Sequence, residues 1–130
     1  MDDLNEKSDV FIHDLLSGST FLASLSTLGT QANGASFAPN LSASGRFVVF
    51  ESGASNLVVG DDAQMDVFVR DLQVGVTVRV SVSATGHNTN GSSGSAMISA
   101  NGRYVVFESS ATNLVVTNHN ATSTVFLRDM

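Results

Sequence analysis

The amino-acid sequence predicts an all-β protein built from repeated units of antiparallel strands. Three observations point to this class. One stretch of the chain occurs twice, runs of consecutive apolar residues have the length of strands, and Gly, Ser and Asn cluster between these runs. No long segment has a helical periodicity, and the only proline is Pro39. Short strands joined by polar turns account for all of these features.

The composition narrows the classes of function. The chain has 130 residues, the length of one domain, and carries a net charge of −6, which repels phosphate backbones and argues against a nucleic-acid partner. It has no cysteine, so a disulfide framework and a thiol nucleophile are both excluded. The acidic start, MDDLNEKSDVF, lacks the basic and apolar regions of a signal peptide, and no apolar run approaches the roughly 18 residues of a membrane span. We therefore expect neither a signal peptide nor a membrane span.

The repeat has a constant spacing. Ser42–Val59 reads SASGRFVVFESGASNLVV, and Ser99–Val116 reads SANGRYVVFESSATNLVV, 57 positions later. Upstream, DVFIHDL from Asp9 recurs as DVFVRDL from Asp66 and again as TVFLRDM from Thr124, the last step being 58. The sequence thus predicts a single repeat domain over residues 1–130, with copies at 9–65 and 66–123 and a third copy that begins at 124.

Each repeat contains four candidate strands. Arg46–Ser52 and Asp66–Leu72 are apolar at consecutive positions, which is typical of strands covered on both faces. Val76–Ser83 alternates strictly, so we expect its valines to face the core and Thr77, Arg79, Ser81 and Ser83 to face water. Ala38–Ser42 and its counterpart Ser95–Ser99 are weaker candidates.

This gradient of burial predicts β-propeller blades of four antiparallel strands, because blades stacked around an axis sandwich their middle strands. The chain would form a partial propeller of about two blades plus terminal part-blades. A β-sandwich is the main alternative, although it needs no repeat of this fidelity. We expect apolar faces at Val10/Ile12 and at Val125/Leu127 to lie uncovered at the two ends. The residues expected in the core are Phe47, Val49, Phe50, Val67, Phe68, Val69, Tyr104, Val106, Phe107, Val125 and Phe126.

The motifs S-A-x-G-R-[FY]-V-V-F-E-S, A-[ST]-N-L-V, D-V-F-[VI]-x-D-L and T-x-R-V-S-V resemble the WD-like propeller repeats of the TolB type. The resemblance runs from Asp3 to Met130. It implies a four-stranded blade and a noncatalytic protein-binding or scaffolding role in bacterial envelope or surface proteins, hence a periplasmic or extracellular location. Some members of the family place the propeller beside a peptidase domain. Propellers close with about four to eight blades, and this chain supplies little more than two.

Two acidic loops precede the V-F strands and are candidate metal sites. Oxygen ligands at alternate positions could hold a hard cation such as Ca²⁺ weakly. Alternatively, the same side chains cap backbone amides in turns, and the absence of a bidentate glutamate favours this second interpretation. A third loop, with Asn118 and Asn120, has no carboxylate. The candidate ligands are Asp3, Asn5 and Asp9 in the first loop and Asp61, Asp62 and Asp66 in the second.

No catalytic or cofactor-binding residue is predicted. The sequence has no G-x-S-x-G, P-loop or H-E-x-x-H motif, and its three histidines, His13, His87 and His119, lie apart from one another. We therefore expect a noncatalytic propeller segment that serves as a protein-interaction module or structural scaffold in a larger protein. Its partner would be another protein or a second copy, held through open blade edges. The alternative is an accessory propeller domain of a hydrolase or peptidase whose catalytic domain lies outside this chain.

Overall fold

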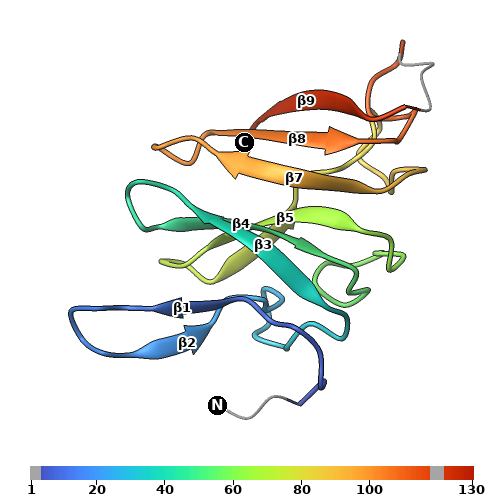
Figure 1. The fold of residues 1–130 in the computed structure, drawn as a ribbon. Helices are drawn as coiled ribbons and strands as arrows, with labels where there is room; N and C mark the ends of the chain where they lie inside the picture. Colours follow the sequence, from blue (N-terminus) through green and yellow to red (C-terminus); the bar gives the residue numbers. More distant parts are fainter. Residues whose placement is uncertain (1–3, 118–121) are drawn as a thin grey trace.

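The computed structural model describes residues 4–117 and 122–130, which form three antiparallel sheets stacked on one another (Figure 1). The first sheet pairs β1 (Phe11–His13) with β2 (Thr20–Leu22). The second sheet has the order β3-β4-β5-β6, and the third has the order β7-β8-β9. Their bounds are Ser36–Leu41, Phe47–Ser52, Asp66–Asp71, Val76–Arg79, Ser93–Ile98, Tyr104–Ser109 and Thr124–Asp129 for β3 to β9.

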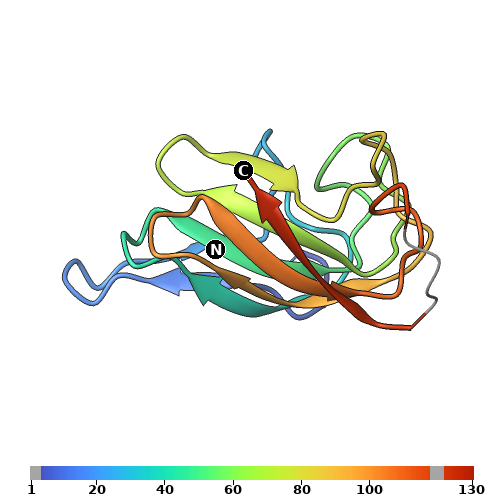
Figure 2. The same ribbon diagram turned by 90° about the horizontal axis from the view of Figure 1, so that it is seen from above.

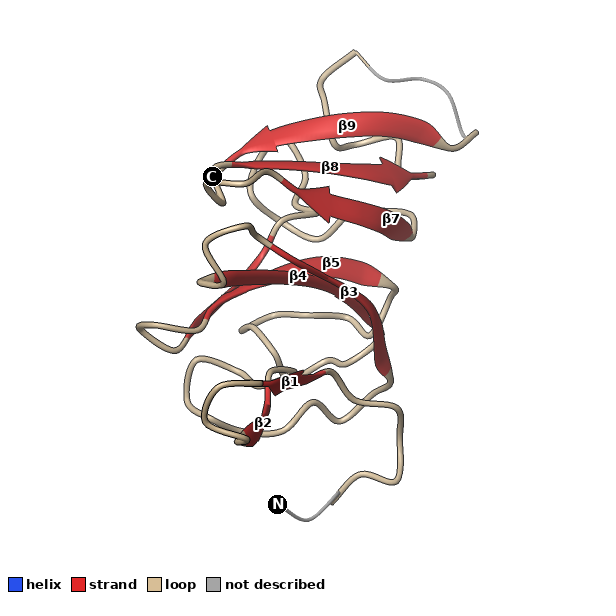
Figure 3. Ribbon diagram, turned by 60° about the vertical axis from the view of Figure 1, so that its left-hand side comes forward, coloured by secondary structure: helices blue, strands red, loops and turns tan. Residues whose placement is uncertain are grey.

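Within each sheet, every strand is hydrogen-bonded to the next strand along the chain, and this is the topology of propeller blades. Figure 2 shows the three sheets lying over one another, and Figure 3 shows that the described elements are all strands joined by loops. The second sheet is therefore a complete blade, the first is a part-blade, and the third lacks its fourth strand. The described residues include no helix long and apolar enough to cross a membrane.

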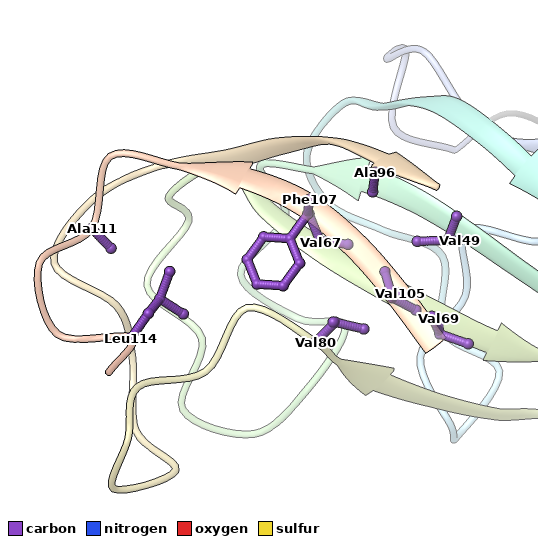
Figure 4. Close-up of a cluster of buried hydrophobic side chains, with 9 residues drawn as sticks. All are labelled: Val49, Val67, Val69, Val80, Ala96, Val105, Phe107, Ala111 and Leu114. Atoms are coloured by element: carbon purple, nitrogen blue, oxygen red, sulfur yellow. The ribbon is translucent and has the colours of Figure 1, made fainter. Parts of the chain in front are cut away.

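The second and third sheets are held together by a cluster of nine buried residues (Figure 4). The second sheet contributes Val49, Val67 and Val69, and the third sheet contributes Val105 and Phe107. Consecutive apolar residues serve both neighbouring sheets because successive side chains of a strand point to opposite faces. Val49 thus faces the third sheet, while Val48 and Phe50 belong to the cluster below.

A second cluster joins the first and second sheets. We call it the lower cluster, and the cluster between the second and third sheets the upper cluster. The lower cluster contains Val10, Phe50 and Phe68, and the rings of Phe50 and Phe68 stack with their centroids 5.8 Å apart. Phe107 and Phe126 repeat this pair in the third sheet at 5.9 Å. The four phenylalanines therefore hold strands of one sheet together and fill the space between sheets.

Two residues expected in the core are exposed instead. Tyr104 is 37% exposed and Val125 is 68% exposed, because among the described residues no sheet covers that face of the third sheet. At the other end, the expectation that Val10 and Ile12 lie uncovered is also wrong, since Val10 is 2% exposed within the lower cluster and Ile12 packs half-buried against it. The apolar pattern of a strand defines a face to be covered, and the neighbouring sheet decides whether that face is covered.

The polar face of β6 is buried, contrary to expectation. Thr77 is 4% exposed, and its hydroxyl donates to the carbonyl of Leu25 at 2.5 Å, in the segment that follows β2. Arg70 reaches the same segment, donating to the carbonyls of Leu25 and Ser26 at 3.2 Å. β6 ends at Arg79, whereas the alternating pattern predicts a strand that continues to Ser83. Its polar side chains are thus part of the contact between sheets.

Candidate functional site

The second acidic loop brings its three carboxylates together. Asp61, Asp62 and Asp66 each offer an oxygen, and these oxygens lie within 4.8 Å of one another. Asp66 opens β5, while Asp61 and Asp62 lie in the loop before it. The side chain of Asp61 has no exposed surface, and that of Asp66 is 1% exposed. Two of the three carboxylates are therefore removed from solvent, while Asp62 is exposed.

Arg79 at the end of β6 supplies a positive charge inside this cluster. Its Nη1 lies 3.0 Å from Oδ1 of Asp61 and 3.4 Å from Oδ2 of Asp66. Its Nη2 donates to Oδ1 of Asn88 at 2.6 Å. Within the described part of the chain, Oδ2 of Asp61 and Nε of Arg79 are buried without a hydrogen-bond partner. The guanidinium thus pairs with two of the three carboxylates of the candidate metal site.

Burial governs the acid–base behaviour of both carboxylates. Loss of solvent raises the pKa of Asp66 to about 6, against the opposing effects of the Ser81 hydrogen bond and the Arg79 charge. Burial likewise raises the pKa of Asp61, and Arg79 again opposes the change. One guanidinium faces two buried carboxylates, so the cluster favours protonation of a carboxylate.

The first acidic loop is built differently. Asp9 accepts hydrogen bonds from the Ser24 hydroxyl at 2.6 Å, from Gln31 Nε2 at 2.7 Å and from Asn5 Nδ2 at 3.2 Å. Asn5 Nδ2 also donates to the carbonyl of Ala32 at 2.6 Å. Asp3 lies outside the described residues. Asn5 therefore presents its amide nitrogen to Asp9, while its Oδ1 accepts the amide of Lys7 at 2.6 Å, a hydrogen-bond pattern typical of a turn.

A repeated Asp–Ser contact underlies both loops, and sequence reasoning missed it. Ser81 donates to Asp66 at 2.6 Å and accepts the amide of Val67 at 2.9 Å. Ser24, 57 positions earlier, makes the same two contacts with Asp9 and Val10. The recurrence of the serine at the repeat spacing was the available signal. Arg79 had no such signal, because Leu22 holds its place in the first repeat.

The free face of the third sheet is an exposed apolar surface at one end of the stack. Met97, Val106 and Leu127 stand opposite one another on β7, β8 and β9. Met97 is 60% exposed and Leu127 is 65% exposed, and Val125 adds to the same face. An exposed apolar face beside an unpaired strand edge is typical of a protein-contact surface.

A groove of about 450 Å³ lies beside this sheet. Its walls include Val76 and Val78 of β6, Arg103, and Met130 after β9. The second sheet has β6 as its fourth strand, and the third sheet has no described strand in that place. The groove therefore marks the position of a fourth strand in the third blade.

Comparison with known proteins connects the fold to solved structures. No family model matches the chain, and no curated protein matches it. A structure assigned as TolB from Agrobacterium tumefaciens aligns with a TM-score of 0.57 and 21% identity, covering 94% of this chain and 37% of that chain. TolB from Acinetobacter baumannii aligns with a TM-score of 0.51 and 16% identity, covering 93% of this chain and 24% of that chain.

The chain thus spans between a quarter and two fifths of the length of these structures. At such identities the likeness concerns the fold. The stacked antiparallel sheets, the strand order and the two alignments together show that the chain has the fold of a TolB-type β-propeller, of which it forms a segment.

Proposed function

We propose that this chain is a noncatalytic β-propeller segment that acts as a protein-interaction module or structural scaffold within a larger bacterial envelope or secreted protein. The observation that carries the proposal is the free face of the third sheet, where Val125 and Leu127 are 68% and 65% exposed. Burial of such side chains stabilises a complex by about 1.5–3 kcal/mol each when it is complete. A periplasmic or extracellular location belongs to the same proposal and rests on the family resemblance.

The buried cluster supports a noncatalytic role. Asp61 and Asp66 lie beneath Arg79, whose side chain is itself 7% exposed, so a substrate has no open path to either carboxylate. A general acid or base must come within hydrogen-bond reach of its substrate. The cluster is better suited to joining β5, β6 and the loop before β5.

The second candidate is an accessory propeller domain of a hydrolase or peptidase. The short coverage of the aligned structures leaves room for it, since the chain matches 37% and 24% of their lengths. The reading frame that encodes the chain separates the two candidates. Further repeats of the same kind support a scaffold, whereas an adjoining domain with Ser, Asp and His at catalytic spacing supports the accessory role.

Site-specific photo-crosslinking tests the interaction surface. A photoreactive amino acid at Leu127 should give a discrete covalent adduct in bacterial cells that produce the chain. The matched control carries the same group at Val59, which is fully exposed on the loop between β4 and β5 and should give no discrete adduct. Equal labelling from both positions, or no adduct from position 127, would contradict the proposal.

A further inference from the structure

The two interfaces between sheets differ in extent, although the same repeat builds both. The upper cluster includes Val49, from β4. The lower cluster has no residue in the equivalent place, because the first sheet has no strand that matches β4. As a result Leu41 is 47% exposed at the lower interface, whereas Ile98, its counterpart 57 positions later, is half-buried. The lower interface is an incomplete form of the upper one.

The free face of the third sheet carries the residues that the lower interface lacks. Val106 stands 57 positions after Val49, and Leu127 stands 58 positions after Val69. Val49 and Val69 are 0% and 3% exposed, because the third sheet covers them, while Leu127 is 65% exposed. The third sheet thus presents the same kind of surface that the second sheet uses to bind its neighbour.

A glycine and an aromatic ring repeat this complementarity. The ring of Phe47 lies so close to Gly102 that a Cβ at this glycine would collide with it. Gly45 is the counterpart of Gly102, and a Cβ there would meet nothing within 4 Å. Tyr104 is the counterpart of Phe47, and it is 37% exposed. In the described part of the single chain, Gly45 of the second sheet has no aromatic ring against it, and Tyr104 of the third sheet has no glycine beneath which to pack.

The strand β1 occupies the place that a neighbouring chain would need. The sequence of β9 copies it, since Val125, Phe126 and Leu127 correspond to Val10, Phe11 and Ile12. β9 is paired with β8 over six residues, whereas β1 is paired with β2 over three and belongs to a sheet of two strands. Sheets of two strands are marginally stable, so β1 is the strand that can be replaced.

We propose that β9 of one chain replaces β1 of a second chain and pairs with the β2 of that chain. The resulting sheet has the order β7-β8-β9-β2, which is the order of the complete second sheet. Val69 opposes Val78 in the second sheet and Ile12 opposes Phe21 in the first, so Leu127 would oppose Phe21 of the second chain. The inference rests on the proposed function and names its partner as another copy of this chain.

The exchange covers the surfaces that are open in the single chain. The incoming β2 fills the groove over Val76 and Val78. Its Thr20 meets Arg128 as Thr77 meets Arg70, whose Nη1 donates to the threonine hydroxyl at 2.9 Å. The free face of the third sheet covers the lower side of the next chain's second sheet, including Leu41.

The interface is heterologous, so the assembly forms a ring if its rotation closes. Each chain contributes its own second sheet and one sheet shared with a neighbour, which makes two blades per chain. Because propellers close with about four to eight blades, a ring would contain two to four chains.

Disulfide exchange between chains tests the predicted register, because the chain has no cysteine of its own. A Leu127→Cys chain is mixed with a Phe21→Cys chain under mild oxidation. We expect a covalent heterodimer as the main product, since directly opposed residues of paired strands lie within disulfide reach. A Val59→Cys chain replaces the Leu127→Cys chain as the control and should give little product. Equal yields from the two mixtures would overturn the proposal.

A second variant prevents the replacement within one chain. A disulfide between Ile12→Cys and Phe21→Cys ties β1 to β2. The mass measured by light scattering at tens of micromolar should therefore fall from a multiple of 13.6 kDa to 13.6 kDa. Reduction of the same sample should restore the larger mass. The control disulfide, between Ser93→Cys and Ser109→Cys, lies buried within the third sheet, where the two hydroxyls are 2.9 Å apart, and should leave the mass unchanged.

A monomeric wild-type chain at this concentration would overturn the inference. If position 127 still crosslinks to a different protein in cells, the proposed function survives this result. If the chain is monomeric and position 127 gives no adduct, both fail.

Discussion

Phe50 shows at the scale of one residue how the stack is stabilised. It is fully buried, stacks on Phe68 within its own sheet and contacts the cluster beneath. Both functions arise from consecutive apolar residues, because Val49 next to it faces the opposite sheet. A single side chain thus contributes to pairing within a sheet and to packing between sheets.

Replacing Phe50 with alanine should therefore lower the free energy of unfolding by about 3–5 kcal/mol, since it leaves a cavity between two sheets. Urea unfolding measures the change. Leu28→Ala is the matched control, because Leu28 is 93% exposed and its loss should cost less than about 0.5 kcal/mol. A Phe50→Ala chain within 1 kcal/mol of wild type would contradict the role of Phe50 in the core.

The pKa of Asp66 predicts how stability depends on pH. Burial raises this pKa from 3.8 to about 6, so the folded chain holds more protons than the unfolded chain between about pH 4 and 6. The free energy of unfolding should accordingly fall as the pH rises through this window, by at most about 3 kcal/mol, and the loss is complete above pH 6.

Urea unfolding at pH 4.5 and pH 7 checks this prediction. The Asp66→Asn chain should show a smaller fall between the two values, because its side chain does not ionise. Asp71 acts in the opposite direction below pH 4, since its hydrogen bonds with Arg46 lower its pKa. An equal fall in the wild-type and Asp66→Asn chains would contradict a raised pKa of Asp66.

At the scale of elements, Arg79 joins β6 to the loop before β5. Leu4 and Leu22 stand 57 positions before Asp61 and Arg79, so the sequence has two leucines at the positions equivalent to this ion pair. Removing one partner of a buried ion pair leaves an uncompensated charge, whereas removing both does not.

Arg79→Leu should thus lower the free energy of unfolding by about 3–5 kcal/mol, because it removes the guanidinium that neutralises the buried carboxylates of Asp61 and Asp66. The double variant Asp61→Leu/Arg79→Leu should recover part of this loss. Thermal and urea unfolding of the two variants give the comparison. A double variant less stable than Arg79→Leu alone would show that the pair contributes more than neutralisation of its charges.

Calcium should have little effect on either acidic loop. Arg79 already faces Asp61 and Asp66, and Asp9 accepts three hydrogen bonds from neutral side chains. A ligand that binds only the folded chain raises its melting temperature by mass action. We expect no shift, or a small one, in millimolar calcium. A large shift that Asp61→Asn abolishes would instead make the second loop a calcium site.

The whole molecule is an open stack with unequal ends. One end has two strands in its sheet and a buried Val10, and the other has a free apolar face and an unpaired edge at β9. A charged side chain on this face remains hydrated in the single chain but opposes association with any apolar partner.

Leu127→Asp should therefore leave the circular dichroism spectrum of the folded chain unchanged and remove its association, as measured by light scattering and by the crosslinking yield at Val125. Val59→Asp adds the same charge on an exposed loop and should change neither measurement. Association that persists in the Leu127→Asp chain would place the contact surface elsewhere on the molecule.

The sequence by itself determined the strands and their grouping into blades. The spacing of 57 aligned the repeats, and the consecutive apolar residues around Phe50 and Phe68 identified strands covered on both faces. These features are local or periodic, so they can be read without knowing which segments meet. The Asp–Ser contacts could have been predicted in the same way, since Ser24 and Ser81 recur at the repeat spacing.

Only the tertiary structure decided which faces are covered. Val67 and Val125 occupy equivalent positions in nearly identical strands, yet Val67 is fully buried and Val125 is 68% exposed. The physical reason is that the alternation of side chains depends on the strand alone, while burial depends on a neighbouring sheet. The same holds for Arg79, which looks like a solvent-facing residue in an alternating strand and becomes buried because β6 folds back beside the loop that carries Asp61.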